Sequence, residues 1–489
     1  MEQYKMLIAG QWVDSASGQC FESMNPATGK PWALIPRGTP EDVDRAVRAA
    51  HAALRSPAWG GLSATARGAL LRKLADLLAS EADSLARTET RDNGKLIAEM
   101  TLQLRYLPQF LYYFAGLADK VEGSVPPIEK PGIFNYTRLE PIGVVAAITP
   151  WNSPLLLAVS KLAAALAAGC TMVMKPSEHA SASLLEFARL IERAGIPAGV
   201  VNVITGFGNE IGDAIVSHPK VAKIAFTGGE VGGRAISQLA ARDFKSVTLE
   251  LGGKSPNIVF DDAIIDDAVK GAISGIFAAS GQTCIAGSRL LLSRRIHDEF
   301  VEKLLTFARQ ARIGDPASMD TQVGPITTAQ QYDRVLGYIE IAKQEGAKCV
   351  LGGNRIAGEG LFVEPTIFTG VHNHMRIAQE EVFGPVLSVI PFDSDEEAIE
   401  IANDTLYGLA AGVWTQSMKR AFTVSNRIEA GTVWVNTYRA ASFMSPFGGY
   451  KHSGIGRENG VDSIREYLQT KSVWMNYGAD VPNPFVMRI

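Results

Sequence analysis

Residues 141–178 read PIGVVAAITPWNSPLLLAVSKLAAALAAGCTMVMKPSE and hold two apolar, β-prone runs on either side of an apolar helical segment. The runs 141–149 and 171–175 predict strands, and residues 155–168 predict the helix between them. Strands this apolar are typical of a parallel sheet, because helices cover both of its faces. The stretch therefore predicts a strand–helix–strand unit with parallel strands.

The same alternation continues downstream as far as residue 251. We expect strands over 200–205, 221–227 and 246–251, and helices over 180–194, 209–217 and 232–241. Such an alternation predicts an α/β fold with a Rossmann-like, doubly wound sheet. Ligands of these sheets bind beyond the carboxyl ends of the strands, so a site is expected in the turns that follow them.

The rest of the chain divides into three further parts. Helical periodicity over 41–58 and 64–87 predicts N-terminal helices. A renewed alternation predicts a second α/β domain, with strands over 257–260, 289–293, 410–415 and 431–436 and helices over 263–279, 296–310 and 327–345. Residues 120–139 are Pro-rich and then β-prone, so they form either a linker or an arm that pairs with another subunit.

Composition excludes several classes of function. The chain has 489 residues, which is too long for a single hydrophobic core, and its 46% hydrophobic and 20% charged residues are ordinary for a globular protein. A net charge of −4 without a basic block argues against a nucleic-acid partner. No secretory signal is visible and the longest apolar stretch, 155–169, is too short to cross a bilayer, so we expect no membrane partner and a cytoplasmic location.

Cysteine and histidine usage also bears on the cellular compartment and on metal binding. Four cysteines in so long a chain do not make a disulfide framework, which fits a reducing compartment. The seven histidines show no metal-ligand spacing with cysteines or acids, so no metal is expected.

Two glycine turns follow predicted strands of the first sheet. Gly206, Gly208 and Gly212 are spaced GxGxxxG, one residue longer than the dinucleotide fingerprint, and FTGGEVGG (226–233) joins the next strand to its helix. Backbone N–H groups left free at such a helix N-terminus would suit a pyrophosphate. The alternative is tight packing, for which glycine is the default turn residue.

Two residues are candidates for acid–base and nucleophilic chemistry. Cys284 lies in the polar, glycine-rich loop ASGQTCIAG (279–287), where a thiolate could attack a carbonyl. The alternative is a small buried hydrophobe. Glu250 ends a strand between Leu249 and Leu251, and apolar neighbours would raise its pKa towards that of a useful general base. Otherwise it points to water.

Three further loops contain polar candidates. The Asn152 amide could donate to an oxyanion or merely close a turn. Lys175 with Ser177 and Glu178 could hold a ribose, or could form an ordinary helix start capped by Ser177. Glu381 and Phe383 lie in EEVFGP (380–385), a loop with no obvious structural need for paired acids.

Taken together, seven segments in order resemble the aldehyde dehydrogenase superfamily over nearly the whole chain. They are PWN (150–152), MKPSE (174–178), FTGG (226–229), LELGGKSP (249–256), GQTC (281–284), EEVFGP (380–385) and PFGGYKHSGIGRENG (446–460). The resemblance implies that an aldehyde is oxidised to a carboxylic acid by a nicotinamide cofactor, without coenzyme A.

The resemblance also implies a role for each matching residue. Cys284 would attack the aldehyde, Asn152 and the Cys284 N–H would hold the oxyanion, and Glu250 would activate the water that hydrolyses the thioester. Lys161 and Glu458 match positions that tune the thiol and relay protons. The implied cofactor contacts are Ile148, Trp151, Lys175, Ser177, Glu178, Gly208, Thr227, Gly228, Gly229, Leu251, Gln331, Glu381 and Phe383.

Two of these positions bear on the cofactor. The family often has Ser where this chain has Gly229, so one hydroxyl contact to phosphate would be missing and the cofactor held more weakly. Glu178 favours NAD+ over NADP+, because a carboxylate would repel the 2′-phosphate. NADP+ stays open as the alternative.

The family fold implies three domains and an oligomer. The boundaries would be 1–121 with 140–249 for the NAD-binding domain, 250–466 for the catalytic domain, and 122–139 with 467–489 for an oligomerisation arm. The arm would complete a sheet of a neighbouring subunit, which implies a homodimer or homotetramer.

The substrate is an aldehyde of open identity. Where the family often has bulky side chains, this chain has Ser153, Leu157 and Ser160, and the facing loop carries Arg439, Ala441 and Phe447. These walls suggest room for a substituted, aromatic or semialdehyde-type substrate, with Arg439 holding an anionic tail. The rival functions are a CoA-acylating dehydrogenase and a non-catalytic structural or binding protein with the same fold.

Overall fold

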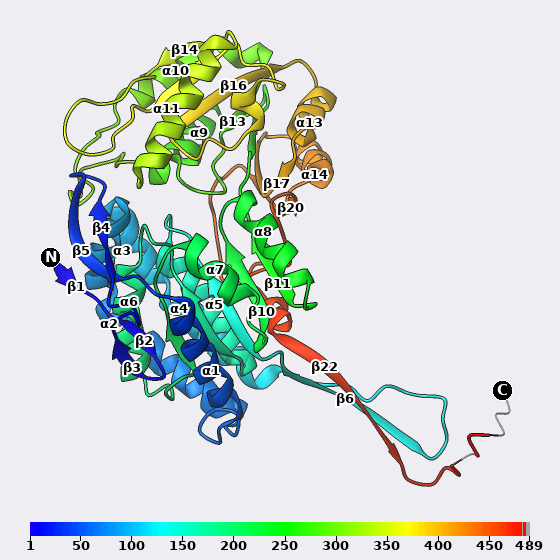
Figure 1. Ribbon diagram of the computed structural model, residues 1–489. Coiled ribbons are helices and arrows are strands. Elements are labelled where there is room, and N and C mark those ends of the chain that lie inside the picture. The colour runs from blue at the N-terminus through cyan, green and yellow to red at the C-terminus, as the bar shows by residue number, and fades with distance from the viewer. Residues whose placement is uncertain (482, 486–489) are drawn as a thin grey trace.

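The computed structural model describes residues 1–481 and 483–485. Two large sheets, each covered by helices, form most of the molecule, and a thin two-stranded ribbon projects from the lower body (Figure 1). The two bodies face each other across a junction that residues from both of them line. None of the helices in the described part of the chain is both long and apolar enough to cross a membrane.

The lower sheet has eight strands in the order β21-β11-β10-β7-β8-β9-β2-β3. Its centre is parallel and consists of β7 (Val144–Ile148), β8 (Thr171–Lys175), β9 (Val201–Val203), β10 (Val221–Thr227) and β11 (Ser246–Glu250). The chain runs outward from β7 to β9 and then returns to β10, on the other side of β7. The predicted doubly wound sheet is confirmed, and its topological switch lies between β7 and β10.

The helices of this body lie where periodicity predicts them, with one extension. They are α1 (Pro40–Arg55), α5 (Pro154–Ala168), α6 (Ala182–Arg193), α7 (Gly208–Val216) and α8 (Glu230–Ala241). Helix α2 (Ala64–Asn93) runs past the predicted residue 87 to a left-handed cap at Gly94. Its last turns bury polar side chains, such as Glu89 and Asp92, which an apolar pattern cannot reveal. Two unpredicted helices follow, α3 (Ile97–Tyr106) and α4 (Pro108–Leu117).

The upper sheet has seven strands in the order β14-β15-β16-β13-β12-β18-β19. They are β12 (Pro256–Val259), β13 (Arg289–Ser293), β14 (Lys348–Leu351), β15 (Thr366–Thr369), β16 (Val386–Phe392), β18 (Ala410–Trp414) and β19 (Thr432–Val435), of which β14 alone is antiparallel. Its helices are α9 (Ile265–Phe277), α10 (His297–Ala308), α11 (Ala329–Gln344), α12 (Arg376–Gln379), α13 (Asp395–Asn403) and α14 (Met418–Arg427). The second α/β unit is therefore present, with β14–β16 as additions to the prediction.

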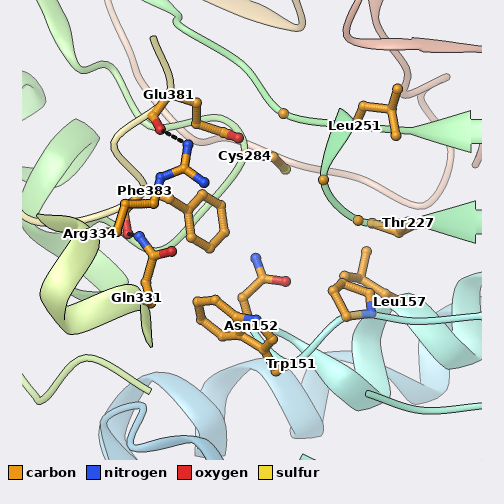
Figure 2. Close-up of a pocket in the computed structure, with 14 residues that line it drawn as sticks. Trp151, Asn152, Leu157, Thr227, Leu251, Cys284, Gln331, Arg334, Glu381 and Phe383 are labelled. Carbon is orange, nitrogen blue, oxygen red and sulfur yellow. Dashed lines mark hydrogen bonds between the residues drawn. The ribbon is translucent and has the colours of Figure 1, made fainter. Parts of the chain in front are cut away.

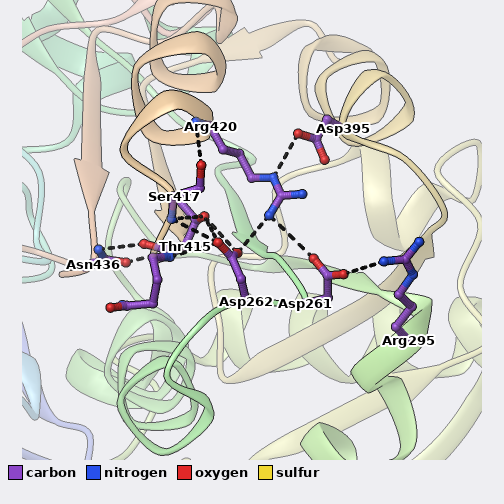
Figure 3. A network of polar contacts seen from close by, with 9 residues as sticks. Asp261, Asp262, Arg295, Asp395, Thr415, Ser417, Arg420 and Asn436 are labelled. Carbon is purple, nitrogen blue, oxygen red and sulfur yellow. Dashed lines mark hydrogen bonds and ion pairs between the residues drawn. The ribbon is translucent and has the colours of Figure 1, made fainter.

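A charged network fastens α13 and α14 to the end of β12 (Figure 3). Asp262 accepts hydrogen bonds from the Thr415 hydroxyl at 2.8 Å and the Ser417 N–H at 2.9 Å. Arg420 donates to Asp262 at 2.9 Å and to Asp395 at 2.8 Å. One guanidinium thus joins three elements that are far apart in sequence.

The two ends of the chain add strands that the sequence pattern did not predict. At the N-terminus, β2 (Met6–Ile8) and β3 (Gln11–Val13) extend the lower sheet, while β1 (Glu2–Gln3), β4 (Cys20–Asn25) and β5 (Lys30–Pro36) form a small separate sheet. Near the C-terminus, β17 (Tyr407–Gly408) pairs with β20 (Tyr450–Lys451). Strands of two or three residues are too short to show a period, and the longer β4 and β5 contain a single β-branched residue, Ile35, between them.

The predicted arm is a ribbon of β6 (Ile133–Pro141) and β22 (Leu468–Asn476), paired antiparallel along their full length. Residues 122–132 lie outside this pairing, and residues 482 and 486–489 of the predicted arm lie outside the described residues. The projection of the ribbon is plain in Figure 1.

One segment differs from the predicted division into domains. β21 (Gly454–Ile455) joins the lower sheet as an antiparallel edge beside β11, although its residues fall within the predicted range 250–466. The 3-10 segment Val461–Tyr467 then packs on α5. The chain therefore returns to the first body before it enters the arm.

Candidate active site

The carboxyl ends of β7, β10 and β11 meet the upper body at a cavity of about 190 Å³ (Figure 2). Both bodies supply its walls: Pro150, Trp151, Asn152, Leu157, Thr227, Gly228, Gly229, Leu251 and Gly252 from the lower one, and Cys284, Gln331, Arg334, Glu381 and Phe383 from the upper one. The sequence-predicted nucleophile therefore lies at the switch point of the sheet.

The loop that carries Cys284 is held in an unusual backbone conformation. Ala279, Ser280 and Gly281 have φ values of 54°, 52° and 70°, which place three successive residues in the left-handed region. A side chain at Gly281 would also overlap the Gly384 carbonyl. Gln282 then anchors the loop, since its amide donates to the Pro325 carbonyl at 3.1 Å and accepts from the Thr327 N–H at 2.9 Å.

Asn152 reaches this loop from the other body. Its amide donates to the Gln282 carbonyl at 3.1 Å and is buried beside Cys284 in the cavity wall. Asn93, at the end of α2, donates to the Trp151 carbonyl at 3.2 Å and so fixes the turn that presents Asn152. The predicted oxyanion donor and nucleophile are therefore brought together.

The thiol of Cys284 is strongly disfavoured as a thiolate. Burial, together with the charges of Glu250 and Glu381, raises its pKa to about 12. At neutral pH it carries its proton, so attack on a carbonyl requires a group that accepts that proton.

Glu250 is a buried carboxyl at the end of β11, 3% exposed. Neither of its oxygens has a hydrogen-bond partner within the described residues. Burial first, and then the charge of Glu458, raise its pKa well above the ordinary value. A carboxyl with a raised pKa is a stronger base than an ordinary glutamate, which is what a general base at this place needs.

Lys161 and Glu458 form a buried ion pair behind the cavity. The Lys161 ammonium also donates to the Thr227 hydroxyl at 2.6 Å, and the Ser160 hydroxyl donates to Glu458 at 3.3 Å. Because Thr227 lines the cavity, this chain of polar groups runs from the cavity wall to Glu458.

A second cavity of about 370 Å³ continues along the sheet edge. Lys175 and Glu178 form an ion pair of 3.2 Å in its wall. Burial acts to raise the pKa of Glu178, but the charge of Lys175 and a backbone hydrogen bond hold it below the ordinary value, so the carboxylate is charged. Nine predicted cofactor contacts line this cavity: Ile148, Trp151, Lys175, Ser177, Glu178, Gly208, Thr227, Gly228 and Gly229.

The floor of this second cavity is the start of α8. Gly229 is the N-cap, so no side chain satisfies the first N–H groups of the helix, and a Cβ at Gly229 would meet open space. At Gly228 a Cβ would overlap the Phe226 ring, which explains the glycine there. Free N–H groups beside open space fit the phosphates of a dinucleotide.

The loop after α12, which contains Glu381 and Phe383, forms the opposite wall of the first cavity. Phe383 has φ 56° and its ring meets that of Trp151 edge-on, with centroids 5.3 Å apart. Gln331 donates to the Val382 and Phe383 carbonyls at 2.8 and 3.0 Å. Glu381 accepts from the Gly253 N–H at 3.0 Å, and its pKa is raised to about 7 by burial.

Sequence reasoning missed two cations at this site. Arg334 lines the cavity one helical turn after Gln331 and donates to the Glu381 carbonyl at 2.8 Å (Figure 2). Its spacing of three from Gln331 was the available signal. Lys95 is buried and donates to the Ser153 hydroxyl at 2.8 Å, and no local pattern distinguishes it from a surface lysine.

The predicted substrate residues are not gathered in one place. Leu157 lines the cavity with Cys284, while the hydroxyls of Ser153 and Ser160 are engaged by Lys95 and by Glu458. Arg439, Ala441 and Phe447 belong to the loop between β19 and β20, outside the cavity wall.

The aldehyde dehydrogenase family model matches residues 12–473. The chain belongs to the aldehyde dehydrogenase family. It is 48% identical, over the full length of both chains, to (Z)-2-((N-methylformamido)methylene)-5-hydroxybutyrolactone dehydrogenase of Acinetobacter baylyi. It is 47% identical to the putative aldehyde dehydrogenase DhaS of Bacillus subtilis, over 96% of this chain and 95% of that one.

Solved aldehyde dehydrogenase structures have the same fold. Betaine aldehyde dehydrogenase of Staphylococcus aureus in complex with NAD+ superposes with a TM-score of 0.97 at 40% identity, covering 99% of this chain and 97% of that one. Aldehyde dehydrogenase of Bacillus cereus in complex with NAD+ gives 0.96 at 45% identity, covering 98% and 97%. This member of the family is accordingly an NAD(P)-dependent enzyme that oxidises an aldehyde to the carboxylic acid.

Proposed function

We propose that Cys284 is the nucleophile, that Asn152 and the Cys284 N–H hold the oxyanion, and that Glu250 is the general base. The observation that carries this assignment is the meeting of the Cys284 thiol and the Asn152 amide in one cavity wall, with an unpaired buried carboxyl close enough to raise the thiol pKa. Their proximity suits these roles, because the nucleophile, the oxyanion donor and the base must all act at the carbonyl carbon of the substrate.

The residues present fit NAD+. The uncapped start of α8 would hold the pyrophosphate, Lys175 and Glu178 the adenosine ribose, and Gln331, Glu381 and Phe383 the nicotinamide half, with Ile148, Ser177, Gly208 and Leu251 as packing walls. When bound, NAD+ accepts the hydride that leaves the substrate carbon. Gly229 lacks a hydroxyl, so the phosphate there depends on backbone donors.

The protein groups act in two stages. Addition of the Cys284 sulfur to the aldehyde carbon forms the carbon–sulfur bond, passes the thiol proton to water in the cavity, and converts the aldehyde oxygen into an oxyanion that the Asn152 amide stabilises. After hydride loss leaves a thioester on Cys284, Glu250 takes a proton from water as the water attacks, and the acid leaves. Glu458 and Lys161 pass that proton on through the buried pair.

Glu178 supports a preference for NAD+, because its carboxylate would lie against a 2′-phosphate. The Glu178→Gln variant should raise kcat/KM for NADP+ by about tenfold, since one close like-charge contact is worth roughly 1–2 kcal/mol in partly buried surroundings. Parallel assays with both cofactors check this, and an unchanged NADP+ value would contradict it.

Water, not coenzyme A, is proposed to resolve the thioester, because Glu250 is retained. Product analysis with and without coenzyme A separates the two, since the CoA-acylating rival gives acyl-CoA. The non-catalytic rival predicts no NADH with any aldehyde. The deciding experiment is the Cys284→Ser variant, which should lose at least about 1,000-fold in kcat while still binding NAD+ by calorimetry.

The remaining proposals concern the size of the substrate, the oligomeric state, the domain boundaries and the cellular location. We propose substituted, aromatic or semialdehyde-type substrates, because Ser153, Leu157 and Ser160 stand where the family often has bulkier side chains, and Leu157 lines the cavity with Cys284. A kcat/KM higher for acetaldehyde than for benzaldehyde would contradict this. We also propose a homodimer or homotetramer through the arm, the domain boundaries given above, and a cytoplasmic location, which the four free cysteines support.

A further inference from the structure

Arg439 occupies a strained position in the loop between β19 and β20, outside the wall of the cavity that contains Cys284. Its φ is 66°, a left-handed conformation that costs energy for any residue with a side chain. The residues on either side of it are tied down, because the Tyr438 hydroxyl donates to the Ile285 carbonyl at 3.0 Å and the Ala440 carbonyl accepts from the Trp434 indole at 2.8 Å. Ile285 is the neighbour of Cys284, so the fold holds Arg439 close to the nucleophile loop.

The guanidinium of Arg439 is incompletely satisfied. Its Nη1 atom is buried and has no hydrogen-bond partner within residues 1–481 and 483–485. A buried N–H of a charged group without a partner is costly, and more so than for a neutral one. A group retained at that cost, in a strained backbone and next to a residue that is tied to the nucleophile loop, is suited to bind an acceptor from outside the chain.

A second cation, the buried Lys95, lies close enough to Arg439 for their charges to interact. Lys95 is 6% exposed, and its ammonium donates to Ser153, the neighbour of Asn152. Burial lowers the pKa of Lys95, and the charge of Arg439 lowers it further, which places the two cations within each other's field.

Two carboxyls lie in the field of Lys95, and each has one oxygen engaged by a backbone N–H while the other has no partner within the described residues. Glu99 accepts from the Ala279 N–H at 2.9 Å, and Glu89 accepts from the Leu155 N–H at 3.3 Å. Burial raises the pKa of Glu89 to about 7, so it carries only part of a charge near neutrality. Glu89 therefore offsets the nearby cations only in part.

We propose that Arg439, with Lys95 behind it, forms a carboxylate subsite, so that the preferred substrates are aldehydes that carry a carboxylate, such as 4-oxobutanoate or 4-formylbenzoate. This inference rests on the proposed function, because the carboxylate must be held while the aldehyde carbon lies at Cys284. The guanidinium supplies paired N–H donors to the anion, and the small side chains of Ser153 and Leu157 leave space for the connecting atoms.

The test compares each acid with its methyl ester, which has the same shape without the charge. For the parent enzyme, kcat/KM should be higher for 4-oxobutanoate than for methyl 4-oxobutanoate, and likewise for the benzoate pair. Arg439→Met should lower kcat/KM for the acids by about 10- to 100-fold, the loss expected for a charged hydrogen bond, and leave the esters within about twofold. Most of the loss should be in KM, because the contact is present before and during the reaction.

Two controls keep the outcomes apart. Arg439→Lys should restore part of the acid preference, and Arg309→Met, at an exposed arginine after α10, should change neither substrate. Equal rates for acid and ester in the parent, or equal losses in Arg439→Met, would overturn the carboxylate subsite while aldehyde oxidation stands. If none of the four aldehydes yields NADH, the proposed function itself fails.

Discussion

The active-site residues divide into those that chemistry makes conspicuous and those that only the fold reveals. Cys284 and Glu250 could be predicted, because a thiol in a glycine-rich loop and an acid between leucines are unusual in a sequence. Lys95 and Arg334 could not, because a lysine or arginine near a helix end is normally solvated. Lys95 is buried and Arg334 is exposed, and both are positioned by contacts with residues more than forty positions away.

Glu250→Gln separates the two stages of the reaction. The glutamine cannot take a proton from water, so kcat should fall by about 100-fold or more while the first turnover survives. Rapid mixing should show a burst of NADH followed by slow release, and mass spectrometry should find the acyl group on Cys284. A slow first turnover without an acyl-enzyme would assign Glu250 to the earlier stage.

The pH dependence of this base follows from the direction of its pKa. A raised pKa keeps Glu250 protonated, and thus inactive as a base, over a wider acid range than an ordinary glutamate. The rate of thioester hydrolysis should therefore rise as pH increases through that pKa, and Glu250→Gln should flatten the profile. Hydrolysis that is already maximal at pH 5 would contradict the assignment.

The elevated pKa of the thiol makes a separate prediction. With a pKa of about 12, the thiolate fraction of Cys284 grows about tenfold per pH unit below that value. Alkylation of the cofactor-free enzyme by iodoacetamide should therefore accelerate steadily from pH 7 to pH 10. A plateau near pH 8 would show that the free thiol is already activated.

At the scale of elements, the periodicity of apolar residues and the length of each strand or helix determined which elements the sequence could predict. The five central strands of the lower sheet and β12, β13, β18 and β19 are mainly apolar runs of three to seven residues, and each lies within or close to its predicted range. β14 is partly exposed and antiparallel, so it lacks a buried-strand signature. The buried polar residues at the end of α2 exist to hold neighbouring loops and break the apolar period.

The network around Arg420 predicts a stability effect without a catalytic one. Arg420→Met should lower the free energy of unfolding by about 1–3 kcal/mol, because Asp262 and Asp395 lose a partner that is only 23% exposed. Urea unfolding followed by tryptophan fluorescence measures this. Arg427→Met is the control on the same helix, since its ion pair with Glu396 is more exposed and worth less than about 1 kcal/mol.

At the scale of the molecule, the ribbon of β6 and β22 is the element through which we expect the subunits to associate. It exposes Phe134, Trp474, Met475 and Tyr477, an apolar surface on a two-stranded element that is marginal in water by itself. Light scattering should find the parent as a dimer or tetramer, and Trp474→Asp should shift it towards smaller species. Phe307→Asp, at an exposed aromatic of α10, is the control that should leave the assembly unchanged.

The placement of the two bodies could not be read from local pattern. Nothing in the run around Cys284 indicates that it will face the ends of β7 and β10, because that juxtaposition depends on the whole topology. The family resemblance supplied the expectation, and the cavity between the bodies is where the structure places those residues together.

Because the edge strand β21 comes late in the sequence, the lower sheet can be completed only late in synthesis of the chain. The lower sheet begins with residues near the N-terminus, yet its last strand and Glu458 are made only after all seven strands of the upper sheet. Until then β11 has an unpaired edge, and Lys161 sits in an apolar interior without its counter-charge. A nascent or truncated chain that ends before residue 454 should consequently depend on chaperones, whereas the full chain closes its own sheet.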